Sequence, residues 1–170
     1  LLADGMACRV PDAQALAVIR REVDDVIAVT DEQVAAAMRA LFSDTHNVAE
    51  GAGAAALAAL LQHPARFAGK RVGLPVCGGN IDARMLASVL MRGLVRDGRL
   101  VRLRVILPDT AGSLAKVATM IGDAGGNIVE VQHQRVFGTA SVKSPEVEFV
   151  LETRGREHAA QIERHLAGHG

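Results

Sequence analysis

The chain has 170 residues, and its 19 Lys and Arg balance its 19 Asp and Glu, so it has no net charge when the histidines are neutral. A chain without a positive field is not expected to bind nucleic acid by neutralising phosphates. Its longest apolar runs, such as residues 52–61, are too short and too rich in Ala and Gly to cross a bilayer. The composition therefore predicts a soluble protein with one domain or two small ones.

The first half of the chain alternates strand patterns with helix patterns. Thr30 and Gln33 have the spacing of a capping box, which predicts a helix that begins at about Asp31. Asp82 is expected to cap a later helix in the same half. The elements expected here are strands at 23–29 and 71–76 and helices at about 31–42, 54–61 and 83–96.

The second half begins near Arg99 and has a different pattern. Apolar residues alternate along 101–107, which predicts a half-buried strand. The elements expected after it are a helix at 114–124, a strand at 128–137, a loop at 138–144, a strand at 147–151 and a helix at about 156–167. This β-α-β-β-α order is the ferredoxin-like motif without its last strand, and its open edge favours pairing with a second copy of the chain.

Four short motifs follow one another along the chain. They are Ala-Asp-Gly-Met-Ala at 3–7, Glu-Gly-Ala-Gly-Ala-Ala at 50–55, Cys-Gly-Gly-Asn-Ile-Asp at 77–82 and Arg-Gly-Leu-Val-Arg-Asp-Gly-Arg at 92–99. With them, the whole chain resembles the C-terminal part of threonine dehydratase (threonine ammonia-lyase), a pyridoxal-phosphate enzyme with an ACT regulatory domain. The resemblance implies an α/β protein: the C-terminal portion of a fold-type II catalytic domain at 1–98 and a ferredoxin-like ACT domain at 99–170.

The resemblance also implies a cofactor site. In that family the residue before Gly-Gly-Asn lies at the pyridine nitrogen of the cofactor, and that residue is Cys77 here. A neutral thiol need not hold the ring nitrogen protonated, so the ring is a weaker electron sink, which suits β-elimination. The residues expected to contact the cofactor are Cys77, Gly78, Gly79, Asn80, Glu50 and Gly5. Two plainer interpretations remain open: Cys77 as a buried structural thiol, and Glu50 as an ordinary carboxylate at a helix N-terminus.

The family's Schiff-base lysine and its phosphate-binding loop have no counterpart in the matched motifs. Lysine occurs only at Lys70, Lys116 and Lys143, none of them in a Ser-Phe-Lys context. The chain also starts without Met, so we expect it to be part of a longer protein and to be inactive on threonine by itself, with no catalytic residue of its own. The alternatives are a non-catalytic ACT module that binds amino acids and dimerises, or a serine-acting or racemase relative.

The resemblance to an ACT domain implies an effector site in the second half. A ligand carboxylate would meet the backbone amides where Gly112 opens a helix, and Asp109 or Asn127 from a partner sheet would meet the ammonium group. The residues expected there are Asp109, Gly112, Ser113, Leu114, Asn127 and Ile128. Ordinary turn and helix-end roles for Asp109 and Asn127 are the alternative.

Cysteine and histidine patterns predict neither disulfides nor a metal site. Cys8 and Cys77 are far apart in the sequence, which is typical of a reducing, cytoplasmic compartment. His158, His165 and His169 fall near helical spacing but lack supporting Cys or carboxylate residues. The expected partners are therefore an amino-acid substrate, an amino-acid effector and another copy of the chain.

Overall fold

The computed structural model describes residues 2–133 and 146–168. The chain divides into two compact units, Leu1–Leu90 and Met91–Gly170, and each is described by itself. The functional boundary expected between residues 98 and 99 stays a prediction. Among the described residues, no helix is both long enough and apolar enough to cross a membrane.

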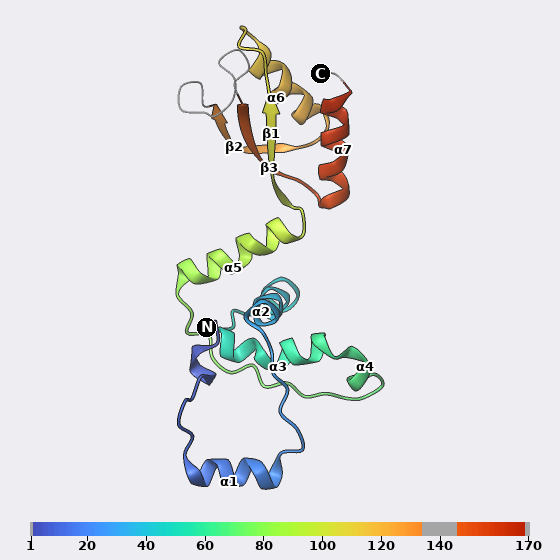
Figure 1. The fold of residues 1–170 in the computed structure, drawn as a ribbon. Helices are drawn as coiled ribbons and strands as arrows, with labels where there is room; N and C mark the ends of the chain where they lie inside the picture. Colours follow the sequence, from blue (N-terminus) through green and yellow to red (C-terminus); the bar gives the residue numbers. More distant parts are fainter. Residues whose placement is uncertain (1, 134–145, 169–170) are drawn as a thin grey trace. The chain divides into compact units, whose positions relative to one another are not determined.

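The first unit is built from helices around a core of small and medium aliphatic side chains. Helices α2 and α3 pack against each other, and Ala37 and Ala54 are fully buried, so the two backbones can approach closely. Met38 is the largest fully buried side chain in this core. The elements are η1 (Asp4–Met6), α1 (Ala13–Glu22), α2 (Asp31–Thr45), α3 (Gly51–Gln62), α4 (Pro64–Phe67) and α5 (Ala83–Arg96), which runs on into the second unit (Figure 1).

The predicted helix starts at Asp31 and Ala83 are confirmed. The Thr30 hydroxyl accepts the Gln33 N–H at 3.3 Å, and the Thr30 N–H donates to Gln33 Oε1 at 2.8 Å, so both halves of the capping box form. Asp82 Oδ1 accepts the amides of Arg84 and Met85 at the start of α5. Local side-chain chemistry is sufficient to place both helix starts.

The predicted strands at 23–29 and 71–76 are wrong as strands. Both segments lack regular secondary structure. A strand requires hydrogen bonds to a neighbouring strand, and none of the described residues of this unit form one beside these segments. Segment 23–29 is instead tied by a side chain, since Arg66 bonds the Asp25 carboxylate at 2.5 Å. That bond, with a smaller contribution from the Val26 amide, lowers the pKa of Asp25.

Helices α1 and α4 were not predicted. Helix α1 follows Pro11 and is capped by Asp12, whose carboxylate accepts the amides of Gln14 and Ala15. None of its residues is buried, so it has no core-facing stripe of the kind that a periodicity argument detects. Helix α4 is a single turn that begins at Pro64, where a helix stop was expected.

The second unit has the predicted β-α-β-β-α order. Its strands are β1 (Leu100–Ile106), β2 (Asn127–His133) and β3 (Glu146–Glu152), and its helices are α6 (Ser113–Asp123) and α7 (Arg156–Ala167). The sheet order is β1-β3-β2, with both pairings antiparallel (Figure 1). The predicted strand at 128–137 is confirmed as far as His133. The rest of it and the predicted loop at 138–144 lie outside the described residues.

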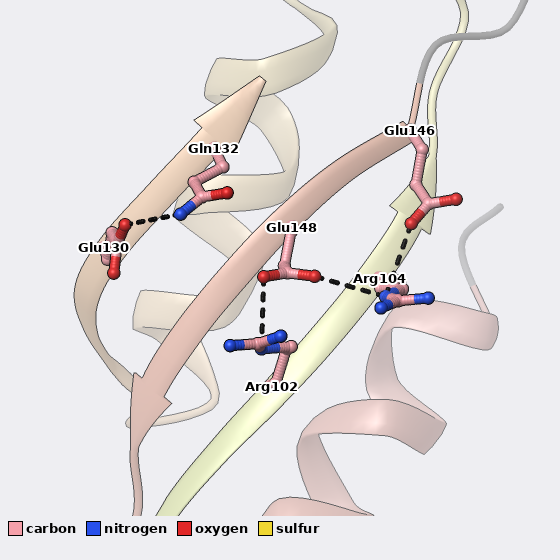
Figure 2. Close-up of polar contacts among 6 residues, drawn as sticks. All are labelled: Arg102, Arg104, Glu130, Gln132, Glu146 and Glu148. Carbon is pink, nitrogen blue, oxygen red and sulfur yellow. Dashed lines mark hydrogen bonds and ion pairs between the residues drawn. The ribbon is translucent and has the colours of Figure 1, made fainter. Parts of the chain in front are cut away.

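The side chains of strand β3 alternate between an apolar face and a charged face of the sheet. Val147, Phe149 and Leu151 are buried against α6 and α7. On the opposite face, the Glu148 carboxylate lies between two β1 guanidinium groups, 3.1 Å from Arg102 and 3.2 Å from Arg104 (Figure 2). The predicted alternation of β1 and β3 is therefore confirmed, and ion pairs between strands cover the solvent face.

We predict that Thr30→Ala lowers the free energy of unfolding of the first unit by about 1 kcal/mol, because the Gln33 N–H loses its acceptor. Thr30→Ser keeps the hydroxyl and is the matched control. Urea unfolding followed by the helical circular dichroism signal measures both. Equal stability of the Ala variant and the wild type would contradict a working capping box.

We predict a larger loss for His158→Ala in the second unit. The buried imidazole accepts the Arg154 N–H on Nδ1 at 3.0 Å and donates from Nε2 to the Ala124 carbonyl at 2.9 Å. Truncation leaves two backbone groups without these partners, at a cost of about 2 kcal/mol or more. Glu163→Ala, an exposed substitution on the same helix, is expected to change the unfolding free energy by less than about 0.5 kcal/mol.

Candidate functional site

The loop at residues 77–79 lies directly on the first turn of α3. A Cβ atom built on Gly53 would be 2.2 Å from the Cys77 carbonyl oxygen and 2.9 Å from that of Gly78. No side chain fits at such distances. The loop backbone can pack against the helix because residue 53 is a glycine. The position of Cys77 is therefore set by α3 rather than by a strand that leads into it.

Glu50 holds the same loop from the N-cap position of α3. Its backbone N–H donates to the Gly78 carbonyl at 3.2 Å. Its carboxylate fills the space above the Gly78 Cα, where a Cβ would be 2.3 Å from Glu50 Oε1. Gly78 has a φ of +83°, a conformation that L residues rarely adopt. Its backbone angle and its contact with Glu50 both require glycine at this position.

The N-terminal segment reaches the same helix turn from another direction. Gly5 lies beside Ala52, and a Cβ on Gly5 would be 3.7 Å from that of Ala52. Gly51 is closed off by backbone, since a Cβ there would be 2.2 Å from the Leu2 carbonyl. Three of the motifs that are separate in the sequence therefore meet around the start of α3.

The structure thus brings together five of the six residues expected at the cofactor, namely Glu50, Cys77, Gly78, Gly79 and Gly5. The sixth, Asn80, follows the loop directly and is exposed. Cys77 is also exposed, so its environment is not that of a buried structural thiol. Sequence reasoning did not assign a role to Gly51 and Gly53 as packing positions. The Glu-Gly-Ala-Gly spacing at a helix start was the signal that could have found them.

The residues expected at the effector site lie in two groups within one chain. Strands β1 and β2 both run antiparallel to β3, and Leu100 and Asn127 both pair with Glu152. Asn127 is therefore at the end of the sheet where β1 begins, whereas Asp109 and the start of α6 follow the end of β1. A single copy of the chain does not bring the two groups together.

Local contacts already engage the polar members of these two groups. The Asn127 side-chain amide donates to Glu152 Oε2 at 3.2 Å. The Ser113 and Thr110 hydroxyls are 2.8 Å apart, next to Gly112, whose φ is +87° at the N-cap of α6. Leu114 and Ile128 are partly buried against the core of the unit. These contacts are made within each group, and the expected effector site stays a prediction.

Within residues 2–133 and 146–168, no three His, Cys, Asp or Glu side chains gather as they would around a metal ion. His158 is engaged by backbone groups on both ring nitrogens. His169 lies outside the described residues.

Comparison with known proteins shows what this chain is similar to. Residues 1–78 match the family described as pyridoxal-phosphate dependent enzyme. The chain is 40% identical to L-threonine ammonia-lyase of Geobacter sulfurreducens and 34% identical to that of Thermotoga maritima, over 169 residues, or 99% of this chain, in each case. Over almost its whole length, the chain is homologous to part of these threonine ammonia-lyases. It spans 42% of the length of these two relatives.

A further relative carries a different substrate in its name. L-threo-3-hydroxyaspartate ammonia-lyase from a Pseudomonas species is 35% identical over 89 residues, 52% of this chain and 28% of that protein. The cofactor of the threonine ammonia-lyase family is pyridoxal phosphate. The names of these relatives differ in the amino acid that they act on.

The residues around the start of α3 fit the ring end of this cofactor. Bound pyridoxal phosphate supplies an electron sink for reactions at the α-carbon of an amino acid. The exposed Cys77 thiol is a hydrogen-bonding group on a loop whose backbone packs against α3, so it is available to a ring nitrogen. Glu50 places a carboxylate beside Gly78, next to Cys77 in the loop.

We predict that Gly78→Ala destabilises the first unit by about 1–3 kcal/mol. The alanine must adopt a positive φ, and its Cβ must displace the Glu50 carboxylate. Gly73→Ala is the matched control, since no atom lies within 4 Å of a Cβ at that position. Chemical denaturation measures both variants. A Gly78 variant as stable as the Gly73 variant would contradict the described loop geometry.

Proposed function

We propose that this chain supplies the pyridine-nitrogen side of the cofactor site of a threonine ammonia-lyase. The reaction of the complete enzyme is elimination of water from L-threonine, followed by hydrolysis of the resulting imine to 2-oxobutanoate and ammonia. The observation that carries the proposal is the packing of Cys77, Gly78 and Gly79 on the first turn of α3, beside Glu50. Cys77 binds the ring nitrogen from a loop that packs against Gly53 at the start of α3.

The Schiff-base lysine and the phosphate-binding loop come from protein outside these 170 residues. Of the lysines, Lys70 and Lys116 are exposed, neither follows Ser-Phe, and Lys143 lies outside the described residues. Support for this division comes from the relatives, which are more than twice as long as the chain. On this proposal the chain alone has no activity on threonine.

Residues 99–170 form an ACT domain that binds an amino-acid effector and joins subunits in the proposed enzyme. The β-α-β-β-α order and the open edges of the three-stranded sheet support this part of the proposal. The separation of Asp109 and Gly112 from Asn127 within one chain favours a site completed by a second copy. The effector carboxylate binds at the start of α6, and Asp109 or Asn127 of the second copy meets its ammonium group.

Reconstitution tests the proposal. The chain is fused behind the portion of the Geobacter sulfurreducens relative that precedes the matched region, and formation of 2-oxobutanoate from threonine is measured. We expect the fusion to bind pyridoxal phosphate and to be active, and the 170-residue chain alone to be inactive. Activity of the chain alone would contradict the proposed division of the site.

Cys77 variants of the fusion test the assigned role of the thiol. We predict that Cys77→Ser retains activity within about tenfold, because a hydroxyl is also a neutral hydrogen-bonding group. Cys77→Asp is expected to lower activity much further, since a carboxylate favours a protonated ring nitrogen. A fusion that binds the cofactor but shows no difference between Ser and Asp would contradict contact between residue 77 and the ring. Effector binding in the absence of any lyase activity would favour the alternative, a non-catalytic ACT module.

A further inference from the structure

We propose that Gly53 is a positioning residue for Cys77, acting through the backbone of the loop at 77–79. This inference rests on the proposed function, because Cys77 is the residue assigned to the cofactor ring. Gly53 touches neither the ring nor a substrate. Its role is to let the Cys77 carbonyl approach the α3 backbone, which determines where the thiol lies.

The contact distances show that the loop backbone packs tightly against Gly53. A Cβ on Gly53 would be 3.0 Å from the Cys77 carbonyl carbon, in addition to the 2.2 Å separation from its oxygen. The obstructing atoms are backbone atoms, which cannot swing aside as a side chain can. Any replacement of Gly53 must therefore move Cys77 or move the start of α3.

On the N-terminal side of the loop, the described residues give Cys77 little support besides this contact. The segment 71–76 that leads into it is not part of a ladder, and the side chains of Val72, Val76 and Cys77 are exposed. After the loop, Ile81 packs against the core, and its N–H bonds the Gly79 carbonyl at 2.9 Å. The loop is therefore held from α3 and from its C-terminal side only.

The hydrogen bond from the Glu50 N–H to the Gly78 carbonyl reports whether the loop is seated. Lifting the loop from Gly53 separates this pair, while the bonds inside α2 are unaffected. The Val34 N–H, which bonds the Thr30 carbonyl at 3.0 Å, is the internal reference, because it exchanges with solvent only through opening of α2.

Amide hydrogen exchange in the full 170-residue chain tests the proposal. Gly53→Ala is expected to accelerate exchange at Glu50 about fivefold or more, the factor for one lost hydrogen bond, with little change at Val34. Gly122→Ala is the matched control, because Gly122 is also a helical glycine and no atom lies within 4 Å of a Cβ there. Unchanged exchange at Glu50, or equal acceleration at Glu50 and Val34, would show that Gly53 has no specific positioning role.

A milder variant keeps the test decisive if Gly53→Ala does not fold. A Cβ on Gly79 would be 3.0 Å from the Val48 carbonyl oxygen, a tight contact that a small shift relieves. Gly79→Ala is therefore expected to accelerate Glu50 exchange less than Gly53→Ala but more than Gly122→Ala. A Gly79 variant that behaves like the Gly122 control would overturn the proposal.

The cofactor provides a readout that separates this inference from the proposed function. In the fusion with the lysine-bearing portion, Gly53→Ala is expected to weaken pyridoxal-phosphate binding about fivefold and to change the absorption spectrum of the bound cofactor. Failure of the unmodified fusion to bind the cofactor would overturn the proposed function, whereas the exchange experiment would still decide whether Gly53 seats the loop. Normal affinity and spectrum in a folded Gly53 variant would overturn the positioning role.

Discussion

The close approach of the Cys77–Gly78 backbone to the first turn of α3 is the contact on which the candidate site depends. It is possible because Gly53 has no side chain, and it brings the Gly78 carbonyl within reach of the Glu50 N–H. The same helix turn receives the N-terminal segment at Gly51. One helix start thus organises three parts of the sequence, which explains why the motifs are rich in glycine and alanine.

Sequence reasoning succeeded where local chemistry decides the structure. The capping pair of Thr30 and Gln33, the Asp82 cap and the alternation along β1 and β3 all follow from rules that operate within a few residues. It failed at 23–29 and 71–76, because a β-branched run becomes a strand only when another strand lies beside it. It also missed α1, whose start is marked by Asp12 but whose residues are not buried.

The candidate site was predictable as a set of residues but not as a geometry. The motifs indicated Glu50, Cys77 and Gly78, but nothing in the spacing showed that the Glu50 carboxylate occupies the space over the Gly78 Cα. In the second unit, the resemblance implied that Asp109 or Asn127 reaches the effector site from a partner sheet, but it did not show where each residue lies along the strands. The antiparallel register places Asn127 and Asp109 toward opposite ends of the sheet, a consequence of strand direction that a list of residues does not contain.

The central claim is that this chain presents the Cys77 thiol to the ring nitrogen of pyridoxal phosphate. The most direct measurement is a crystal structure of the complete cofactor-bound protein, with this chain joined to the portion that carries the lysine. We predict Cys77 Sγ at hydrogen-bonding distance from the pyridine nitrogen, with the Cys77 carbonyl packed against Gly53. Another side chain at the ring nitrogen, or a loop lifted away from α3, would contradict it.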